Sequence, residues 1–172
     1  MRKNGGIFSG FKGDIMNFVG KATINPVLFY TGKVSGYITW GILILSSLHV
    51  VNFPNYSIID LKYIALIVFL IGAIFSTISL INLGRSTRFG LPIEETSFRK
   101  NGIYRLNRNP MYLGFNCFTL AAILYTLNIV VIILGVYSMV IYHFIILGEE
   151  KFLKSRFGNE YVEYKKKVKR YL

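Results

Sequence analysis

Residues 111–147 read MYLGFNCFTLAAILYTLNIVVIILGVYSMVIYHFIIL, and these 37 residues contain no Asp, Glu, Lys or Arg. A helix of that length would extend about 55 Å at 1.5 Å per residue, whereas the hydrocarbon core of a bilayer is roughly 30 Å thick. The stretch is therefore expected to fold back on itself. Its polar break, Thr126-Leu127-Asn128, predicts a tight turn between two antiparallel helices, residues 111–127 and 129–147.

Two shorter uncharged runs precede this stretch, residues 34–51 and 64–81, each of 18 residues. Uncharged apolar runs of this length are typical of membrane-spanning helices, and they predict spans at residues 33–51 and 62–83. We therefore expect an all-α integral membrane protein with about four transmembrane helices, a tight helical hairpin and a cytoplasmic amphipathic tail helix. A length of 172 residues indicates a single domain, residues 1–172.

The basic residues are distributed unevenly along the chain, whose formal net charge is +12. Of the 20 Lys and Arg residues, five precede or begin the first span, six lie between the second and third, and eight follow the fourth; Lys62 is the exception. The positive-inside rule then places both termini in the cytoplasm. This topology accounts for the charge without nucleic acid, for which no recognition motif is present. Residues 1–32 lack a signal-peptide pattern, and residues 22–30, which include Pro26, are expected to form a short interfacial or half-inserted segment.

A second informative region begins at Gly102 and runs into the third span. Asn109 is a residue type that caps helices, and Pro110 suits the first helical position. The positive end of the helix dipole would lie beside Arg105 and Arg108, which predicts a site for an anionic group, although both arginines also fit the positive-inside pattern. A carboxylate pair, Glu149-Glu150, follows the fourth span. An anion site and a carboxylate pair together suit a zwitterionic cofactor.

The tail, residues 149–172, shows helical periodicity with a basic opposite face. Its apolar positions recur at spacings of four, three, four and three: Phe157, Tyr161, Tyr164, Val168 and Tyr171. Gly158-Asn159 is expected to break this helix into two pieces. Two interpretations stay open, namely that the apolar face rests on anionic lipid and that it closes a cofactor pocket.

Two motifs resemble those of a known family. Gly102-Ile-Tyr-Arg-x-x-Arg-Asn-Pro-Met-Tyr-Leu-Gly is similar to the Gly-x-Tyr-x-x-x-Arg-His-Pro-x-Tyr-x-Gly motif of isoprenylcysteine carboxyl methyltransferases and their phospholipid N-methyltransferase relatives. Glu149-Glu-Lys-Phe-Leu, followed by Phe157-Gly-Asn-Glu-Tyr-x-x-Tyr, resembles the second motif of that family. The resemblance covers about residues 84–172, and the first two spans carry no recognisable motif.

The resemblance implies an S-adenosylmethionine-dependent methyltransferase acting on a lipophilic acceptor within the bilayer, such as a prenylated substrate. The expected cofactor-binding residues are Thr96, Ser97, Phe98, Arg99, Tyr104, Arg108, Asn109, Pro110, Met111, Tyr112, Glu149 and Glu150. The residue chemistry agrees, because an arginine at a helix start suits a carboxylate and a glutamate suits an ammonium group. Tyr104, Tyr112 and Tyr161 are candidates to stack on adenine or to face the sulfonium.

Two departures from the family pattern keep alternatives open. Asn109 replaces a histidine and cannot take a proton near neutral pH, and Ile145 replaces an arginine that engages a substrate carboxylate in the carboxyl methyltransferases. The alternatives are a non-enzymatic or degenerate relative and a nicotinamide-dependent membrane reductase of related fold. The catalytic candidates are His143, Arg108 and Glu150, and His143 shares a helical face with Glu150. Two histidines and one cysteine, Cys117, predict no metal site.

The topology is open to direct test. Reporters fused after Leu172 and within residues 52–60 are expected to report opposite sides of the membrane, because 19 of the 20 basic residues fall on one side in the four-span arrangement. A fusion after Leu172 that reports the non-cytoplasmic side would overturn this arrangement.

Overall fold

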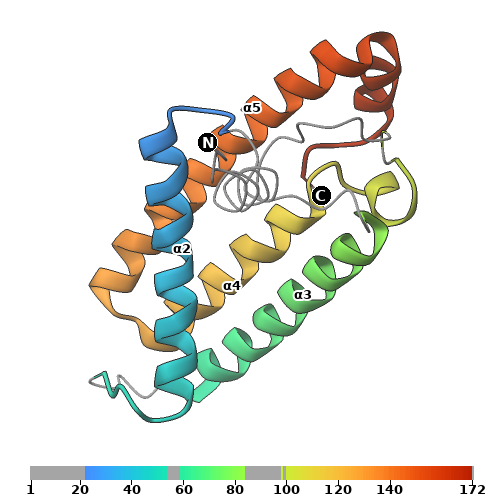
Figure 1. Ribbon diagram of the computed structural model, residues 1–172. Helices are drawn as coiled ribbons and strands as arrows, with labels where there is room; N and C mark the ends of the chain where they lie inside the picture. Colours follow the sequence, from blue (N-terminus) through green and yellow to red (C-terminus); the bar gives the residue numbers. More distant parts are fainter. Residues whose placement is uncertain (1–21, 54–58, 84–97, 99, 172) are drawn as a thin grey trace, which may run out of the picture.

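The computed structural model describes residues 22–53, 59–83, 98 and 100–171 and shows a bundle of four α-helices (Figure 1). These helices and one short 3₁₀ helix are α2 (Pro26–Ser47), α3 (Ile59–Leu83), η2 (Gly102–Arg105), α4 (Pro110–Thr126) and α5 (Ile129–Lys167). Helix α4 packs against each of the other three α-helices, and α2 also packs against α5. The part of the chain that the structure describes contains no β-strand, so the all-α prediction is confirmed there.

The hairpin predicted within the 37-residue stretch is present. Helix α4 ends at Thr126, and Leu127 adopts the left-handed conformation with φ 46°. Asn128 then caps α5, because its side-chain oxygen accepts a 2.9 Å hydrogen bond from the backbone N–H of Val130. The two residues between the helices, Leu127 and Asn128, therefore reverse the chain.

Helix α2 begins earlier than the sequence analysis predicts. Asn25 accepts a hydrogen bond from the Val27 backbone N–H at 2.9 Å, and Pro26 occupies the first helical position. The segment expected at residues 22–30 to be interfacial or half-inserted is helical from Pro26 onward, because the Asn-Pro pair starts the helix there. Its place in the bilayer stays a prediction. The helix ends at Ser47, and His49 follows with φ 58°.

Helix α5 is the longest element, with 39 residues and a kink at Gly158, where φ is 52° and ψ is −125°. At 1.5 Å per residue it covers about 58 Å of chain, which is nearly twice the hydrocarbon thickness of a bilayer. Among the described residues two helices are long and apolar enough to cross a membrane, Leu61–Leu83 and Ile129–Lys167. Four spans remain a prediction.

Helices α3 and α4 approach closely where both carry small residues. A Cβ atom added at Gly114 would clash with the Ser76 hydroxyl and would lie 2.8 Å from the carbonyl oxygen of Gly72. A Cβ at Gly72 would lie 2.9 Å from the carbonyl oxygen of Gly114. The two backbones are therefore in mutual contact at this point, as in membrane helix pairs joined by glycine.

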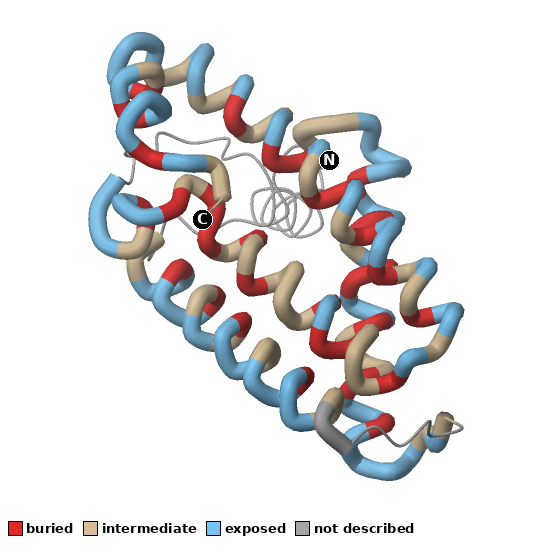
Figure 2. The backbone as a smooth tube through the Cα atoms, turned by 180° about the vertical axis from the view of Figure 1, so that it is seen from behind, coloured by how far each residue is buried: buried red, intermediate tan, exposed pale blue. Residues whose placement is uncertain are grey.

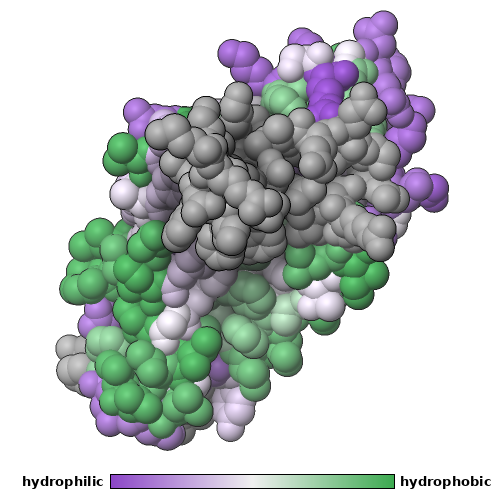
Figure 3. Space-filling view, viewed as in Figure 1, coloured by the Kyte–Doolittle hydropathy of each residue, from purple (hydrophilic) through white to green (hydrophobic). Residues whose placement is uncertain are grey.

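Buried residues lie on the inward faces of the helices, while the outward faces are largely exposed (Figure 2). Many of the exposed residues are large and apolar, and on α3 they include Ile64, Leu66, Ile67, Leu70, Ile71, Ile74 and Ile81. Hydrophilic side chains gather over the last part of α5 (Figure 3). An apolar outer surface over most of the bundle and a polar end are what a membrane helix bundle presents to lipid and water.

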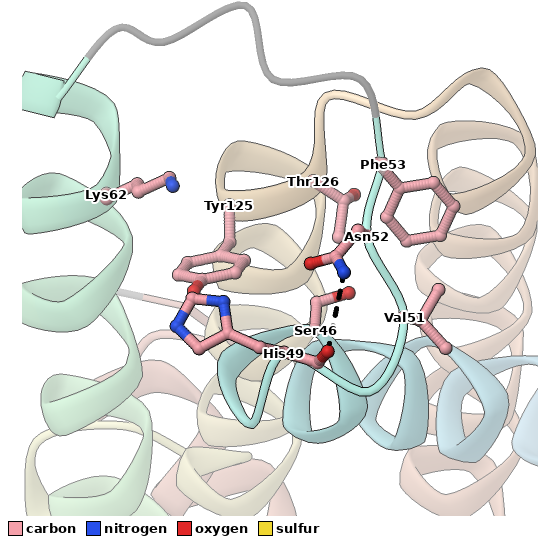
Figure 4. A pocket seen from close by; sticks show the side chains of 8 residues that line it. All are labelled: Ser46, His49, Val51, Asn52, Phe53, Lys62, Tyr125 and Thr126. Carbon is pink, nitrogen blue, oxygen red and sulfur yellow. Dashed lines mark hydrogen bonds between the residues drawn. The ribbon is translucent and has the colours of Figure 1, made fainter.

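A small polar cleft lies at the end of the bundle that holds the hairpin turn. Its lining comes from the end of α2 and the segment that follows it, the start of α3 and the end of α4 (Figure 4): Ser46, His49, Val51, Asn52, Phe53, Lys62, Tyr125 and Thr126. The Lys62 ammonium lies 5.6 Å from the centre of the Tyr125 ring. Lys62, the basic residue that departs from the charge asymmetry, is therefore held against an aromatic face.

The contact between α3 and α4 predicts an unequal response to adding one methyl group. Gly114→Ala is expected to destabilise the protein by about 1–3 kcal/mol, because the new Cβ overpacks a backbone contact. Gly41→Ala is the matched control, since a Cβ at Gly41 in α2 meets nothing within 4 Å. Thermal unfolding of both variants in detergent measures the difference, and equal melting temperatures would contradict the close contact.

Candidate functional site

The site is assembled around the loop that precedes α4. Gly102 has φ 62°, and a Cβ there would clash with the side chain of Asn82 near the end of α3. Glycine is therefore required for η2 to lie against that helix. The loop then reaches Asn107, which is fully buried and accepts a 2.6 Å hydrogen bond from the backbone N–H of Asn109. These contacts fix the position of Arg108.

A buried carboxylate, that of Glu150, lies at the centre of the site. Arg170 donates hydrogen bonds to both of its oxygens, from Nε to Oε1 at 3.0 Å and from Nη2 to Oε2 at 2.9 Å. Arg108 Nη2 lies 3.1 Å from Oε1, and the side chains of Arg108 and Glu150 are only 6% and 7% exposed. Burial would raise the pKa of Glu150, but the hydrogen bonds from Arg170 and the charge of Arg108 hold it below the ordinary value.

These contacts leave part of the Arg108 guanidinium without a hydrogen-bond partner. Its Nε and Nη1 are buried and have no hydrogen-bond partner in the part of the chain that the structure describes. Buried polar groups are normally paired, and a charged group left unpaired is costly. Unpaired donor nitrogens on a buried cation are suited to an anionic ligand.

The neighbouring carboxylate, Glu149, faces a different part of the protein. The Tyr112 hydroxyl on α4 donates to its Oε1 at 2.5 Å, and Lys33 on α2 attracts it electrostatically. Burial raises the pKa of Glu149 to about 6, which the hydrogen bond from Tyr112 and the charge of Lys33 partly offset. This carboxylate is therefore the one of the pair that titrates near neutrality.

The expectation that Asn109 caps α4 is wrong. Its side chain makes no capping hydrogen bond, and its Nδ2 instead donates to the carbonyl oxygen of Arg170 at 3.4 Å. Pro110 does occupy the first helical position, so the amino end of α4 lacks a side-chain cap.

A short stretch after α5, which we name the return segment (residues 168–171), runs back toward the start of α4 (Figure 1). The backbone N–H of Arg108 donates to the carbonyl oxygen of Lys169 at 3.0 Å. Tyr171 then reaches His143 on α5, where its hydroxyl lies 2.8 Å from Nδ1 and the rings stack at 6.1 Å. The return segment therefore contacts both motifs and one catalytic candidate.

The apolar face of the tail is covered by protein. Tyr161, Tyr164 and Val168 form a buried cluster with Phe98, Leu153 and Phe157, and the Tyr164 hydroxyl donates to the Tyr104 carbonyl oxygen at 2.5 Å. The structure thus favours the interpretation in which the tail packs over the site, because the side chains that would rest on lipid are inside. Tyr104, Tyr112 and Tyr161 are all buried, so their rings are not open platforms for adenine.

The remaining predicted residues fall into three groups. Pro110 and Met111 lie in the first turn of α4, beside Arg108, and Phe98 lies in the tail cluster. Thr96, Ser97 and Arg99 lie outside the described residues. Ile145 is fully buried in the core that Phe29, Tyr112, Ile141, Tyr142 and Ile146 form, so the position where the family pattern has an arginine is a packing position here.

Three residues of the site were not predicted from the sequence: Lys33, Asn107 and Arg170. A lysine at the edge of an uncharged run is the one local signal for Lys33. Arg170 lies in a basic stretch with Lys165, Lys166, Lys167 and Lys169, so its sequence context does not distinguish it from surface lysines. Nothing in the local pattern of the loop singles out Asn107.

Comparison with known proteins identifies the family of the chain. Residues 61–160, more than half of the chain, match the phospholipid methyltransferase family, and the protein belongs to that family. Two relatives, from Oryza sativa subsp. indica and subsp. japonica, are each described as a probable protein-S-isoprenylcysteine O-methyltransferase. Each is 30% identical over 113 residues, which are 62% of this chain and 58% of the relative, so little more than half of each relative is matched. No solved structure matches the chain.

The buried ion pair predicts a large and pH-dependent effect of removing its acid. Glu150→Gln is expected to lower the free energy of unfolding by about 3–5 kcal/mol, because two cations lose their counter-charge. Since the pKa of Glu150 is lowered in the folded protein, its contribution is present above about pH 4.5 and is lost as the pH falls through the folded-state value.

Unfolding in detergent between pH 4 and pH 8 measures this effect. Glu163→Gln is the matched control, because Glu163 pairs with Lys166 at an exposed position and is expected to contribute well under 1 kcal/mol. Equal stabilities of the two variants would contradict the central role of Glu150.

Proposed function

We propose that the protein transfers a methyl group from S-adenosylmethionine to a lipophilic acceptor that reaches the site from the bilayer. The observation that carries this proposal is the Arg108 guanidinium. It is buried at the amino end of α4, and its Nε and Nη1 are unpaired among the described residues. Membership of the phospholipid methyltransferase family supports it.

The residues fit the amino-acid part of this cofactor. Its carboxylate needs a charged donor, which Arg108 Nε or Nη1 can supply, and the amino end of α4, which the Asn109 side chain does not cap, adds the positive end of a helix dipole. A charge-assisted hydrogen bond from an arginine holds a carboxylate more strongly than one from a neutral donor does. The unpaired donors of Arg108 are then explained by a ligand.

Glu149 and Glu150 take different parts in this proposal. Glu150 is saturated by Arg108 and Arg170 and acts by positioning Arg108. Glu149, held by Tyr112, is the carboxylate for the cofactor ammonium or ribose hydroxyls. The two glutamates are therefore adjacent in sequence but differ in role: Glu149 faces the ligand, and Glu150 positions Arg108.

When bound, S-adenosylmethionine would supply a methyl group on a positively charged sulfur; the new bond would form between the acceptor and the methyl carbon as the carbon–sulfur bond breaks, which would leave a neutral thioether. The chain contributes chiefly by holding the two reactants in line, which asks little of acid–base residues. His143, half-buried beside Tyr171, is the proton-accepting candidate if the acceptor carries a proton. Exposed apolar faces on the helices allow a lipophilic acceptor to approach from the side.

Two chemical classes of acceptor follow from the relatives. The Oryza relatives are described as O-methyltransferases of isoprenylcysteine, which suggests a carboxylate, whereas the matching family is described as phospholipid methyltransferase. The buried Ile145 gives no cation for a carboxylate acceptor at that position. Family membership favours a methyltransferase over the reductase alternative.

The proposal is tested by binding and by turnover. Purified protein in detergent is expected to bind S-adenosylhomocysteine in calorimetry, and to transfer labelled methyl groups to a total lipid extract or to a prenylcysteine analogue. Transfer to one of the two acceptors identifies its class. Absence of both binding and transfer would support the non-enzymatic alternative.

Glu149 predicts how the binding depends on pH. Because its pKa is raised to about 6, it is neutral below that value and cannot pair with an ammonium group. Affinity for S-adenosylhomocysteine is therefore expected to rise as the pH increases from 5 to 7. Glu149→Gln is expected to abolish this rise and to weaken binding about tenfold or more at pH 7. An unchanged profile in the variant would remove Glu149 from the cofactor site.

A further inference from the structure

The return segment lies beyond residues 61–160, which match the family, yet its side chains reach the centre of the site. Arg170 is the notable residue, because it forms both hydrogen bonds of a forked pair with Glu150 while Arg108 contributes a single nitrogen to the same carboxylate. Two guanidinium groups therefore compete for one buried carboxylate, and Arg170 occupies the larger share.

This unequal sharing has a consequence for Arg108. A buried, ionised carboxylate has about four acceptor positions and is costly to leave unsatisfied. Without the Arg170 fork, the nearest remaining cation with free donors is Arg108, whose Nε and Nη1 are unpaired in the described part of the chain. Lys165 lies 4.0 Å from Oε2, but its side chain is half exposed. Glu150 would then draw Arg108 into a forked pair of its own.

We propose that Arg170 is a positioning residue that saturates Glu150 and so keeps Arg108 Nε and Nη1 from pairing with Glu150, which leaves a charged donor available for the carboxylate of the cofactor. The inference rests on the proposed function, because it assigns a role within the same site. It assigns to the return segment a part in ligand specificity, namely the recognition of the amino-acid carboxylate as distinct from the nucleoside.

The backbone of the return segment is held independently of the Arg170 side chain. The carbonyl oxygens of Lys169 and Arg170 accept hydrogen bonds from the Arg108 backbone and from Asn109, and Val168 is buried in the tail cluster. Tyr171 is anchored on His143. Replacing the guanidinium therefore removes the fork while these four contacts keep the segment in place.

The test compares two ligands that differ in the amino-acid part. S-adenosylhomocysteine carries the carboxylate, whereas 5′-methylthioadenosine has the same adenine, ribose and thioether without it. Arg170→Gln is expected to weaken binding of S-adenosylhomocysteine about tenfold or more, the effect of losing charge-assisted hydrogen bonds, and to change binding of 5′-methylthioadenosine by less than about twofold. Lys167→Gln, which removes the same charge from an exposed position in the tail, is the matched control and is expected to bind both ligands as the wild type does.

Arg170→Lys separates charge from geometry, because lysine keeps the charge but cannot form the planar fork. It is expected to lose several-fold in affinity for S-adenosylhomocysteine alone, and it serves as the decisive variant if Arg170→Gln does not fold in detergent. Equal weakening of both ligands by either variant, or no weakening by Arg170→Lys, would overturn the positioning role. Wild-type protein that binds neither ligand would overturn the proposed function and this inference with it, whereas wild-type binding with unaltered variants would overturn this inference alone.

Discussion

The burial of one charge, the Glu150 carboxylate, is the constraint on which the candidate site depends. A carboxylate can be removed from water at tolerable cost only if its oxygens receive charged hydrogen bonds. Those bonds come from Arg108, 42 residues earlier in the chain, and from Arg170, 20 residues later. The loop before α4, the helix α5 and the return segment must therefore meet at one point. This requirement determines how the residues of the site are arranged.

The two adjacent glutamates of α5 face different parts of the protein. Neighbouring residues on an α-helix project about 100° apart, since a turn takes 3.6 residues. Glu149 consequently faces Tyr112 on α4, whereas Glu150 faces the loop and the return segment. Their surroundings move their pKa values in opposite directions, because Glu149 receives little compensation for its burial and Glu150 receives two arginines. Pairs of acids with divergent pKa values are a common feature of functional sites.

The features that the sequence predicts correctly are those with a local cause. Uncharged runs predict the helices, and the polar residues Thr126 and Asn128 predict the turn between α4 and α5. The two motifs bring Arg108 and Glu150 into consideration together, and the structure places them 3.1 Å apart. These predictions need only composition, periodicity and the order of the motifs along the chain.

The features that the sequence does not predict depend on contacts between distant residues. Asn-Pro occurs at both 25–26 and 109–110, but only Asn25 caps its helix, because the backbone of the return segment offers Asn109 a different partner. The apolar face of the tail has the same periodicity whether lipid or protein covers it, so Phe98 and Tyr104 could not be identified as its neighbours. Arg170 is likewise indistinguishable from nearby basic residues until the fold brings it to Glu150.

Helix α5 runs without a break from Ile129 to its kink at Gly158, and this continuity links the bilayer mechanically to the site. The unbroken part covers about 43 Å, which exceeds the hydrocarbon thickness. A rod of that length accommodates a thinner or thicker membrane by tilting. His143, Glu149 and Glu150 all lie on this unbroken part of α5. Any tilt of the helix would therefore shift these three side chains together, and the buried ion pairs of Glu150 would carry the loop with Arg108 along with them.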